Sequence, residues 1–297
     1  MLSWGLTSSQ FYHLSIISLS GSNENQTVVL GEKILDESKI IPHKIDNKSL
    51  GVKISALSAA VMDKDSGIIL WNKDADQLRS LASITKLMTA LVFLENNSGW
   101  DVPVTLEKND ESNGGTAHIL RGETVTVQDL FNVFLVASDN NSGHALARST
   151  GLEREDFIRL MNQKAGQLGL SQTKFVDITG LKDGNKSTAA DILKLAKTAF
   201  NNNQISSATI QKTYSFSTLD NKYHKVYSTN KLLDSYLEIN AGKTGYIAAS
   251  GYCLVAEVKG KDNRDILVVV LGSDSNLARF YDLKVLSAWT LENFTWY

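Results

Sequence analysis

The sequence predicts an α+β fold in which both ends of the chain contribute strands to one sheet, and a helical insertion covers that sheet. Three observations support this prediction. Strand-like runs lie near the beginning of the chain at 56–62 and 68–71, and others lie near its end at 252–258 and 266–271. The sequence between them has helical patterning. A final helix is expected over 276–294.

The first fifty residues differ from the rest of the chain. They are rich in Ser, Asn and isolated charges and show no sustained period, so we assign 1–50 to a leader or approach segment and 51–297 to one folded domain. Residues 11–19 are apolar and precede Ser-Gly-Ser, as in a degraded or truncated export signal, but no Lys or Arg comes before them. The alternative is a disordered N-terminus. The stretch is too short to cross a bilayer.

The first predicted elements are a hairpin and a buried helix. The turn-like residues 63–67 join the runs 56–62 and 68–71 into a β-hairpin. An almost wholly apolar helix is expected over 83–95. Further helices follow Thr126, Asn140 and Thr188, where Thr126 and Thr188 are expected as N-caps, and another covers 153–168. The runs 252–258 and 266–271 are expected to pair as antiparallel strands.

Charge and cysteine content exclude several classes of function. Lys and Arg total 30 and Asp and Glu total 32, which gives a net charge of −2. This balance gives no reason to expect nucleic acid or an anionic membrane surface as a partner. Cys253 is the only cysteine, so an intramolecular disulfide and a cysteine-based zinc site are excluded. Cys253 lies in an apolar strand-like run, which favours a packing role.

The first chemical motif is Ser83-Ile-Thr-Lys86, at the start of the apolar helix. Residues three apart share a helix face, so the Lys86 amine can reach the Ser83 hydroxyl. Burial near other cations would let Lys86 lose its proton and act as a base. The same spacing recurs at Ser171–Lys174 and Ser228–Lys231, in polar links, where a solvated Lys beside a capping Ser is the plain interpretation.

Two further motifs strengthen the first. Ser138-Asp139-Asn140 lies between two predicted helices, where the alternative is an ordinary helix cap. Lys243-Thr244-Gly245 begins a strand-like run, where the alternative is a plain turn. Gly245 would let the backbone approach a ligand closely, and Lys243 can pair with a carboxylate. Order, spacing and context agree for all three motifs, which independent coincidences would rarely achieve.

Together the motifs S-x-x-K, S-D-N and K-T-G resemble the signature of class A β-lactamases and penicillin-binding proteins. The chain is similar to the D-alanyl-D-alanine carboxypeptidase branch, the low-molecular-mass penicillin-binding proteins, from about residue 55 to 294. The resemblance is carried by the stretches 83–89, 121–130, 138–147, 175–181, 243–246 and 268–272, followed by Arg279-Phe280. It implies a β-lactamase/transpeptidase-like, three-layer α/β/α fold with a five-stranded antiparallel sheet, and makes 51–297 the catalytic domain.

The resemblance also implies an activity. The protein would be a serine D-Ala-D-Ala carboxypeptidase that acts on peptidoglycan stem peptides through an acyl-enzyme on Ser83 and is inhibited covalently by β-lactams. Lys86 would take the proton of Ser83, and Ser138 would relay a proton toward the leaving D-alanine. Asn140 would bind the substrate amide and hold Lys86. We expect no cofactor and no metal, a monomer, and an extracytoplasmic location.

The remaining implied roles belong to the third motif and its surroundings. Lys243 would lie beside Ser138 and raise the local positive potential. Thr244, with Arg279 behind it, would receive the terminal carboxylate. The backbone N–H groups of Ser83 and Tyr246 would form the oxyanion hole.

Three positions depart from the family pattern. Ile247 stands where Thr is frequent, so recognition of the carboxylate would depend more on Thr244 and Arg279. Asp139 stands where carboxypeptidases commonly have Gly, and Leu81-Ala82 replaces a frequent Pro-Ala. Since the closing helix comes so late, we expect neither the C-terminal β-domain nor the amphipathic anchor of several carboxypeptidases.

Four alternatives remain open. A DD-endopeptidase of cross-links would use the same site. A class A β-lactamase would need a Glu in an E-x-x-L-N loop, which none of Glu153, Glu155 and Glu238 provides. A non-catalytic binder of wall peptides would not need the reactive groups. A metallohydrolase could draw on three of the five histidines, His118, His144 and His224, but these fit no known ligand spacing.

Overall fold

The computed structural model of the protein describes residues 41–260 and 263–297, so the signal-like stretch 11–19 lies outside the described residues. The α-helices are α1 (Lys86–Glu95), α2 (Val127–Val136), α3 (Asn140–Arg148), α4 (Arg154–Gln167), α5 (Ala189–Phe200), α6 (Asn203–Thr209) and α7 (Asn276–Asn293). Short 3-10 helices are η2 (Ala82–Thr85), η3 (Lys108–Asp110) and η4 (Lys231–Asp234).

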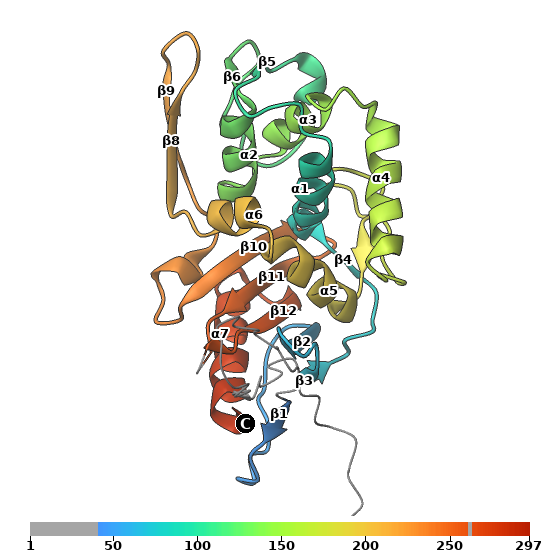
Figure 1. Ribbon diagram of the computed structural model, residues 1–297, viewed down its shortest axis with the longest axis vertical. Coiled ribbons are helices and arrows are strands. Elements are labelled where there is room, and N and C mark those ends of the chain that lie inside the picture. The colour runs from blue at the N-terminus through green and yellow to red at the C-terminus, as the bar shows by residue number, and fades with distance from the viewer. Residues whose placement is uncertain (1–40, 261–262) are drawn as a thin grey trace, which may run out of the picture. The chain divides into compact units, whose positions relative to one another are not determined.

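The strands fall into one larger sheet and several two-stranded pairs (Figure 1). The larger sheet contains β10 (Ile239–Ile247), β11 (Gly251–Val258), β12 (Ile266–Ser273), β2 (Ser58–Asp63) and β3 (Ile69–Lys73), in that order. The pairs are β1 (Pro42–Lys44) with β13 (Phe294–Trp296), β4 (Arg79–Ser80) with β7 (Lys186–Ser187), β5 (Pro103–Thr105) with β6 (Thr124–Thr126), and β8 (Thr213–Ser217) with β9 (Tyr223–Tyr227).

The five-stranded sheet is antiparallel throughout and joins the two ends of the domain, as expected. β12 pairs with β2, so a strand from the end of the chain lies beside one from the beginning. β10 occupies one edge of the sheet, and this strand carries the K-T-G motif. The predicted α+β fold with a helical insertion is confirmed.

Alternating residues of the central strands face two separate hydrophobic cores. In β12, Leu267 and Val269 belong to the core beneath the helical insertion, whereas Val268 and Val270 face α7. Successive side chains of a strand point to opposite faces, so a strand covered on both faces is apolar at every position. This explains the continuous run Ile266–Leu271 and gives the expected three layers, with α7 on one face and α5 on the other.

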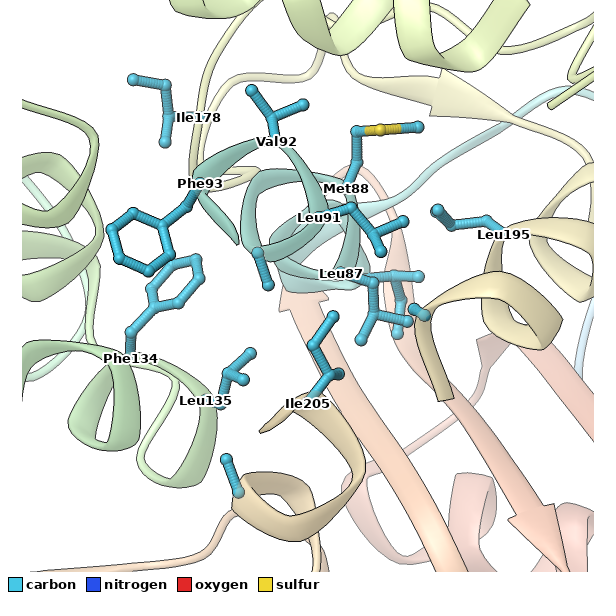
Figure 2. Close-up of a cluster of buried hydrophobic side chains, with 14 of the residues drawn as sticks. Leu87, Met88, Leu91, Val92, Phe93, Phe134, Leu135, Ile178, Leu195 and Ile205 are labelled. Carbon is cyan, nitrogen blue, oxygen red and sulfur yellow. The ribbon is translucent and has the colours of Figure 1, made fainter. Parts of the chain in front are cut away.

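Helix α1 is the centre of the helical layer (Figure 2). Its residues are buried from Lys86 to Phe93, because α2, α4 and α5 surround it. Figure 2 shows Phe93 beside Phe134 of α2 and Leu87 near Ile205 of α6. The helix that carries the chemical motif is therefore fixed by packing on most sides.

The folded part begins before residue 51. β1 pairs with β13, and the Trp289 indole N–H donates to Ser49 Oγ over 2.8 Å. Residues 42–49 therefore pack against the end of the chain, although the sequence assigned them to the approach segment.

Most predicted elements are confirmed, including the caps at Thr126 and Thr188, each of which accepts a backbone N–H in the first turn of its helix. Three features differ. The helix expected from Ser83 begins as the 3-10 turn η2 and becomes α-helical only at Lys86. Helix α6 and the hairpin β8–β9 were not predicted, because both are short and depend on contacts with α2.

Candidate active site

Ser83 lies in η2, half-buried, and Lys86 is the first residue of α1. The Lys86 ammonium nitrogen is 3.0 Å from Ser83 Oγ, so the predicted contact is present. Ala82, just before the serine, has φ +45°, a left-handed conformation that is rare for non-glycine residues. Such strain is found where surrounding packing holds a residue in a functional geometry.

Lys86 is fully buried and has three oxygen partners. Besides Ser83 Oγ, its Nζ contacts Asn140 Oδ1 at 2.6 Å and the Thr179 carbonyl oxygen at 2.9 Å. Burial lowers the pKa of Lys86 to about 7, against the opposing effect of the charges of Asp139 and Asp177. A substantial fraction of Lys86 is therefore the neutral amine near neutral pH.

These partners define how the neutral amine is oriented. A neutral amine has two N–H groups and one lone pair. Asn140 Oδ1 and the Thr179 carbonyl can only accept, so they take both N–H groups. The lone pair of Lys86 then faces the Ser83 hydroxyl, which is the geometry a base needs to remove that proton.

The turn between α2 and α3 presents Ser138 and Asn140. Ser138 has φ +60°, although it is not a glycine. The buried Asp139 caps α3 by accepting the Ser142 N–H at 2.7 Å, and its other oxygen accepts the backbone N–H of His118 at 2.6 Å. Asp139 therefore fixes the turn in which its two neighbours face the site.

Lys243, in the middle of β10, reaches the same place from the sheet. Its Nζ donates to Ser138 Oγ at 2.7 Å. Lys243 is 1% exposed, and burial, followed by the nearby charges of Lys86 and Arg279, lowers its pKa well below the usual value. The structure thus brings Ser83, Lys86, Ser138, Asn140 and Lys243 into one site.

Gly245 explains how strand and helix approach so closely. A Cβ at Gly245 would lie 2.9 Å from the Leu81 carbonyl oxygen and 3.1 Å from the Ser83 nitrogen. Only glycine fits this contact without displacement. Tyr246 follows immediately, is 52% exposed and stacks on Tyr252.

Arg279 lies behind β10 and is 6% exposed. Its guanidinium donates to the carbonyl oxygens of Gly245 at 3.0 Å and Cys253 at 3.4 Å, and to Asn276 Oδ1 at 2.6 Å. Burial lowers its pKa to about 10. Arg279 therefore supports the strand and contributes positive charge from behind it. Thr244, which the sequence paired with Arg279, shares a hydrogen bond of 2.6 Å with Thr229 Oγ1.

Sequence reasoning missed the Thr179 carbonyl and the Thr229 hydroxyl. A backbone carbonyl leaves no residue-type signal, and Thr229 lies in a link whose position depends on the β8–β9 hairpin. The loop that supplies Thr179 folds around Asp177, whose carboxylate accepts the N–H groups of Thr179, Gly180 and Lys182. In the sequence, the stretch 175–181 contributes to the family resemblance but indicates no role for the Thr179 carbonyl.

The other two S-x-x-K motifs do not form such a site. Lys174 and Lys231 are exposed, in contrast to Lys86. The three histidines considered as metal ligands also lie apart. His118 contacts Asp139, His144 contacts the Asp110 carbonyl, and His224 contacts Glu123. Among residues 41–260 and 263–297, no group of His, Cys, Asp and Glu could hold a metal ion.

The family model for D-alanyl-D-alanine carboxypeptidase matches residues 44–275. The chain belongs to this family. It is a serine peptidase, as the three motifs predicted. Among curated relatives, the D-alanyl-D-alanine endopeptidase of Haemophilus influenzae is 37% identical over 75% of this chain and 78% of its own length. D-alanyl-D-alanine carboxypeptidase DacF of Bacillus subtilis is 33% identical over 74% of this chain and 58% of its own length.

The solved structures agree with the family. The crystal structure of the Streptomyces K15 DD-transpeptidase matches this enzyme with a TM-score of 0.76 and 29% identity, over 82% of this chain and all of that one. The β-lactamase/transpeptidase-like fold expected from the sequence is therefore confirmed.

Proposed function

We propose that this D-Ala-D-Ala carboxypeptidase forms its acyl-enzyme on Ser83, with Lys86 as the base, and removes the terminal D-alanine from peptidoglycan stem peptides. The observation that carries the proposal is the buried Lys86 amine, whose two fixed acceptors direct its lone pair at Ser83 Oγ over 3.0 Å. The domain 51–297, together with the packed residues 42–49, would be the catalytic unit.

In the first step Lys86 takes the Ser83 proton while Ser83 Oγ attacks the carbonyl carbon of the penultimate D-alanine. The negative charge that develops on the carbonyl oxygen is bound by the backbone N–H groups of Ser83 and Tyr246. The close approach of Gly245 to Ser83 supports this pairing, since a Cβ at Gly245 would lie only 3.1 Å from the Ser83 nitrogen and the two segments therefore lie side by side. One such donor typically lowers the barrier by ~2.7–4 kcal/mol.

In the second step the C–N bond breaks and the nitrogen of the leaving D-alanine needs a proton. Ser138 gives its hydroxyl proton to that nitrogen and takes up in exchange the proton that Lys86 removed from Ser83, which leaves Lys86 neutral again. The Ser138 hydroxyl accepts an N–H of Lys243, so its own proton is free to point toward the cleft. Asn140 keeps Lys86 in place with Oδ1. Its Nδ2 group donates one N–H to the Gly114 carbonyl at 3.0 Å and has a second N–H for the substrate amide. Water then attacks the ester carbon and gives a proton to the neutral Lys86. The bond to Ser83 Oγ breaks, and Ser83 recovers that proton from Lys86.

The charge of Arg279 and the N–H donors of Lys243 support recognition of a C-terminal carboxylate. Lys243 and Arg279 lie on or behind β10, and Thr244 offers its hydroxyl beside them. Ile247 stands where Thr is frequent in the family and adds no hydroxyl to this group. β-Lactams would acylate Ser83 by the same attack. Such an enzyme acts on the wall, so we place it outside the cytoplasm; in the described part of the chain no helix is long and apolar enough to cross a bilayer.

Cleavage of peptide cross-links is the second candidate, favoured by the name of the Haemophilus influenzae relative. Mass spectrometry of purified muropeptides separates the two reactions. A carboxypeptidase removes one D-alanine from monomeric pentapeptides, and an endopeptidase converts dimers to monomers. Ser83→Ala should abolish either reaction, whereas Ser171→Ala, in an exposed S-x-x-K motif, should leave it intact. Turnover by Ser83→Ala would refute the proposal.

A further inference from the structure

The outer face of the β8–β9 hairpin is a continuous polar and aromatic surface that the mechanism above does not use. Alternate residues of both strands are exposed on it. They are Thr213, Ser215 and Ser217 of β8 and Tyr223, Lys225 and Tyr227 of β9. Figure 1 shows the hairpin standing beside α2 and extending away from the sheet.

The inner face of the hairpin fixes it to the domain. Phe216 and Val226 are buried against the helical layer, and the Tyr214 hydroxyl donates to Asp129 Oδ1 of α2 over 2.7 Å. The ring of His224 stacks on Phe216 with centroids 5.1 Å apart, and its Nε2 lies 3.1 Å from Glu123. The outer residues are therefore presented on a fixed frame.

Two exposed tyrosines dominate the outer face. Tyr223 is 66% exposed and Tyr227 is 64% exposed. They lie four residues apart on one strand, which separates them by about 13 Å. Each ring has a polar neighbour on the face: the Tyr223 hydroxyl donates to Ser215 Oγ over 3.1 Å, and the Lys225 ammonium lies 5.6 Å from the Tyr227 ring centroid.

This chemistry suits a carbohydrate. A sugar ring has an apolar face of C–H groups and a rim of hydroxyls, and tyrosine combines a flat apolar ring with a polar edge. Serine and threonine hydroxyls beside the rings supply donors and acceptors. None of the six outer residues is aliphatic, which disfavours a lipid surface or an apolar protein partner.

The face is continuous with the active site. Only Ser228 separates Tyr227 from Thr229, so their Cα atoms are at most about 7 Å apart. Thr229 shares a hydrogen bond with Thr244 of the K-T-G motif, and its backbone N–H donates to Val136, two residues before Ser138. A peptide stem of a few residues can therefore extend from the cleft to the hairpin.

We propose that the outer face of the β8–β9 hairpin binds the glycan strand of peptidoglycan while the attached peptide stem lies in the cleft. This inference rests on the proposed function, because it names the polymer that carries the substrate of the same site. Tyr223 and Tyr227 stack on sugar rings, and the hydroxyl groups between them bind the sugar substituents.

Co-sedimentation with insoluble peptidoglycan sacculi tests the proposal. The double variant Tyr223→Ser/Tyr227→Ser should bind sacculi about tenfold more weakly, from two lost stacking contacts. Tyr281→Ser is the matched control, since Tyr281 is also 64% exposed but lies on α7, and it should bind as the wild type does. All three proteins should cleave a short acyl-D-Ala-D-Ala peptide at the same rate, which also shows that the variants fold.

The binding of the wild type and of the double variant is then compared on sacculi from which an amidase has removed the peptides. If the hairpin face binds the glycan strand, the tenfold difference in binding remains on these peptide-free sacculi. Equal binding of wild type and double variant to either preparation would overturn the proposal. The proposal would also be overturned if the wild type and the double variant differed only in their binding to phosphatidylglycerol vesicles and not in their binding to sacculi. A wild-type enzyme that fails to cleave the short peptide would instead refute the proposed function, independently of how the hairpin variants bind sacculi.

Discussion

The pH dependence of Ser83 acylation follows from the environment of Lys86. Burial lowers the pKa of this amine to about 7, while the carboxylates of Asp139 and Asp177 prevent a larger fall. Lys86 acts as a base only when neutral, so acylation should be lost as the pH falls through this value. The neutral fraction is ~1% at pH 5, about half at pH 7 and ~99% at pH 9. The acylation rate constant should therefore rise roughly 50-fold from pH 5 to 7 and only about twofold from pH 7 to 9.

Stopped-flow acylation with a chromogenic β-lactam, at enzyme in excess, measures this rate constant directly. Lys86→Ala should lose acylation by orders of magnitude, as expected for removal of a general base, and its residual rate should not show the rise centred near pH 7. Lys174→Ala is the matched control, because Lys174 has the same S-x-x-K spacing but is exposed. A near-native rate in Lys86→Ala would refute the assignment of the base. A rate that is flat from pH 5 to 9, or still climbing steeply beyond pH 9, would refute the perturbed pKa.

Three further variants, the last with a matched control, test separate parts of the account. Asp139→Asn removes a charge that raises the pKa of Lys86, so the midpoint of the acylation profile should move to lower pH; an unchanged or higher midpoint contradicts this reasoning. Arg279→Ala should mainly weaken turnover of an acyl-D-Ala-D-Ala peptide relative to its C-terminal amide in steady-state kinetics, and equal losses on both substrates would remove Arg279 from carboxylate recognition. Gly180→Ala places a Cβ 1.9 Å from the Ala82 carbonyl oxygen at φ +88° and should destabilise the fold by at least ~1–3 kcal/mol in thermal unfolding. Gly166 lies in α4, where an added Cβ would meet nothing within 4 Å, so Gly166→Ala should be neutral or stabilising. Similar effects of the two alanine substitutions would contradict the close approach of Gly180 to Ala82.

The sequence predicted the features that depend on local pattern. The central strands β11 and β12 contain the apolar runs 253–256 and 266–271 because both faces of the sheet are covered there. The caps Thr126 and Thr188 mark helix starts by their own side chains. The sequence also predicted that five side chains from three distant motifs meet in one place, because the order, spacing and context of those motifs match a known signature.

Features that depend on tertiary contacts were not predicted. The Thr179 carbonyl contacts Lys86 because Asp177 folds the loop around it, and no residue type at 179 signals that role. Ala82 and Ser138 adopt left-handed conformations, which the sequence does not indicate because neither residue is a glycine. The pairing of β1 with β13 joins short segments from the two ends of the domain, which neither segment encodes alone.

The central claim is that Ser83 is the nucleophile whose Oγ forms the ester bond of the acyl-enzyme. Intact-protein mass spectrometry after incubation with penicillin tests this claim most directly. The account predicts one bound penicillin per enzyme, mapped by proteolysis to the peptide that contains Ser83, with the same adduct in Ser171→Ala and none in Ser83→Ala. An adduct on another residue, or one that persists in Ser83→Ala, would contradict the account.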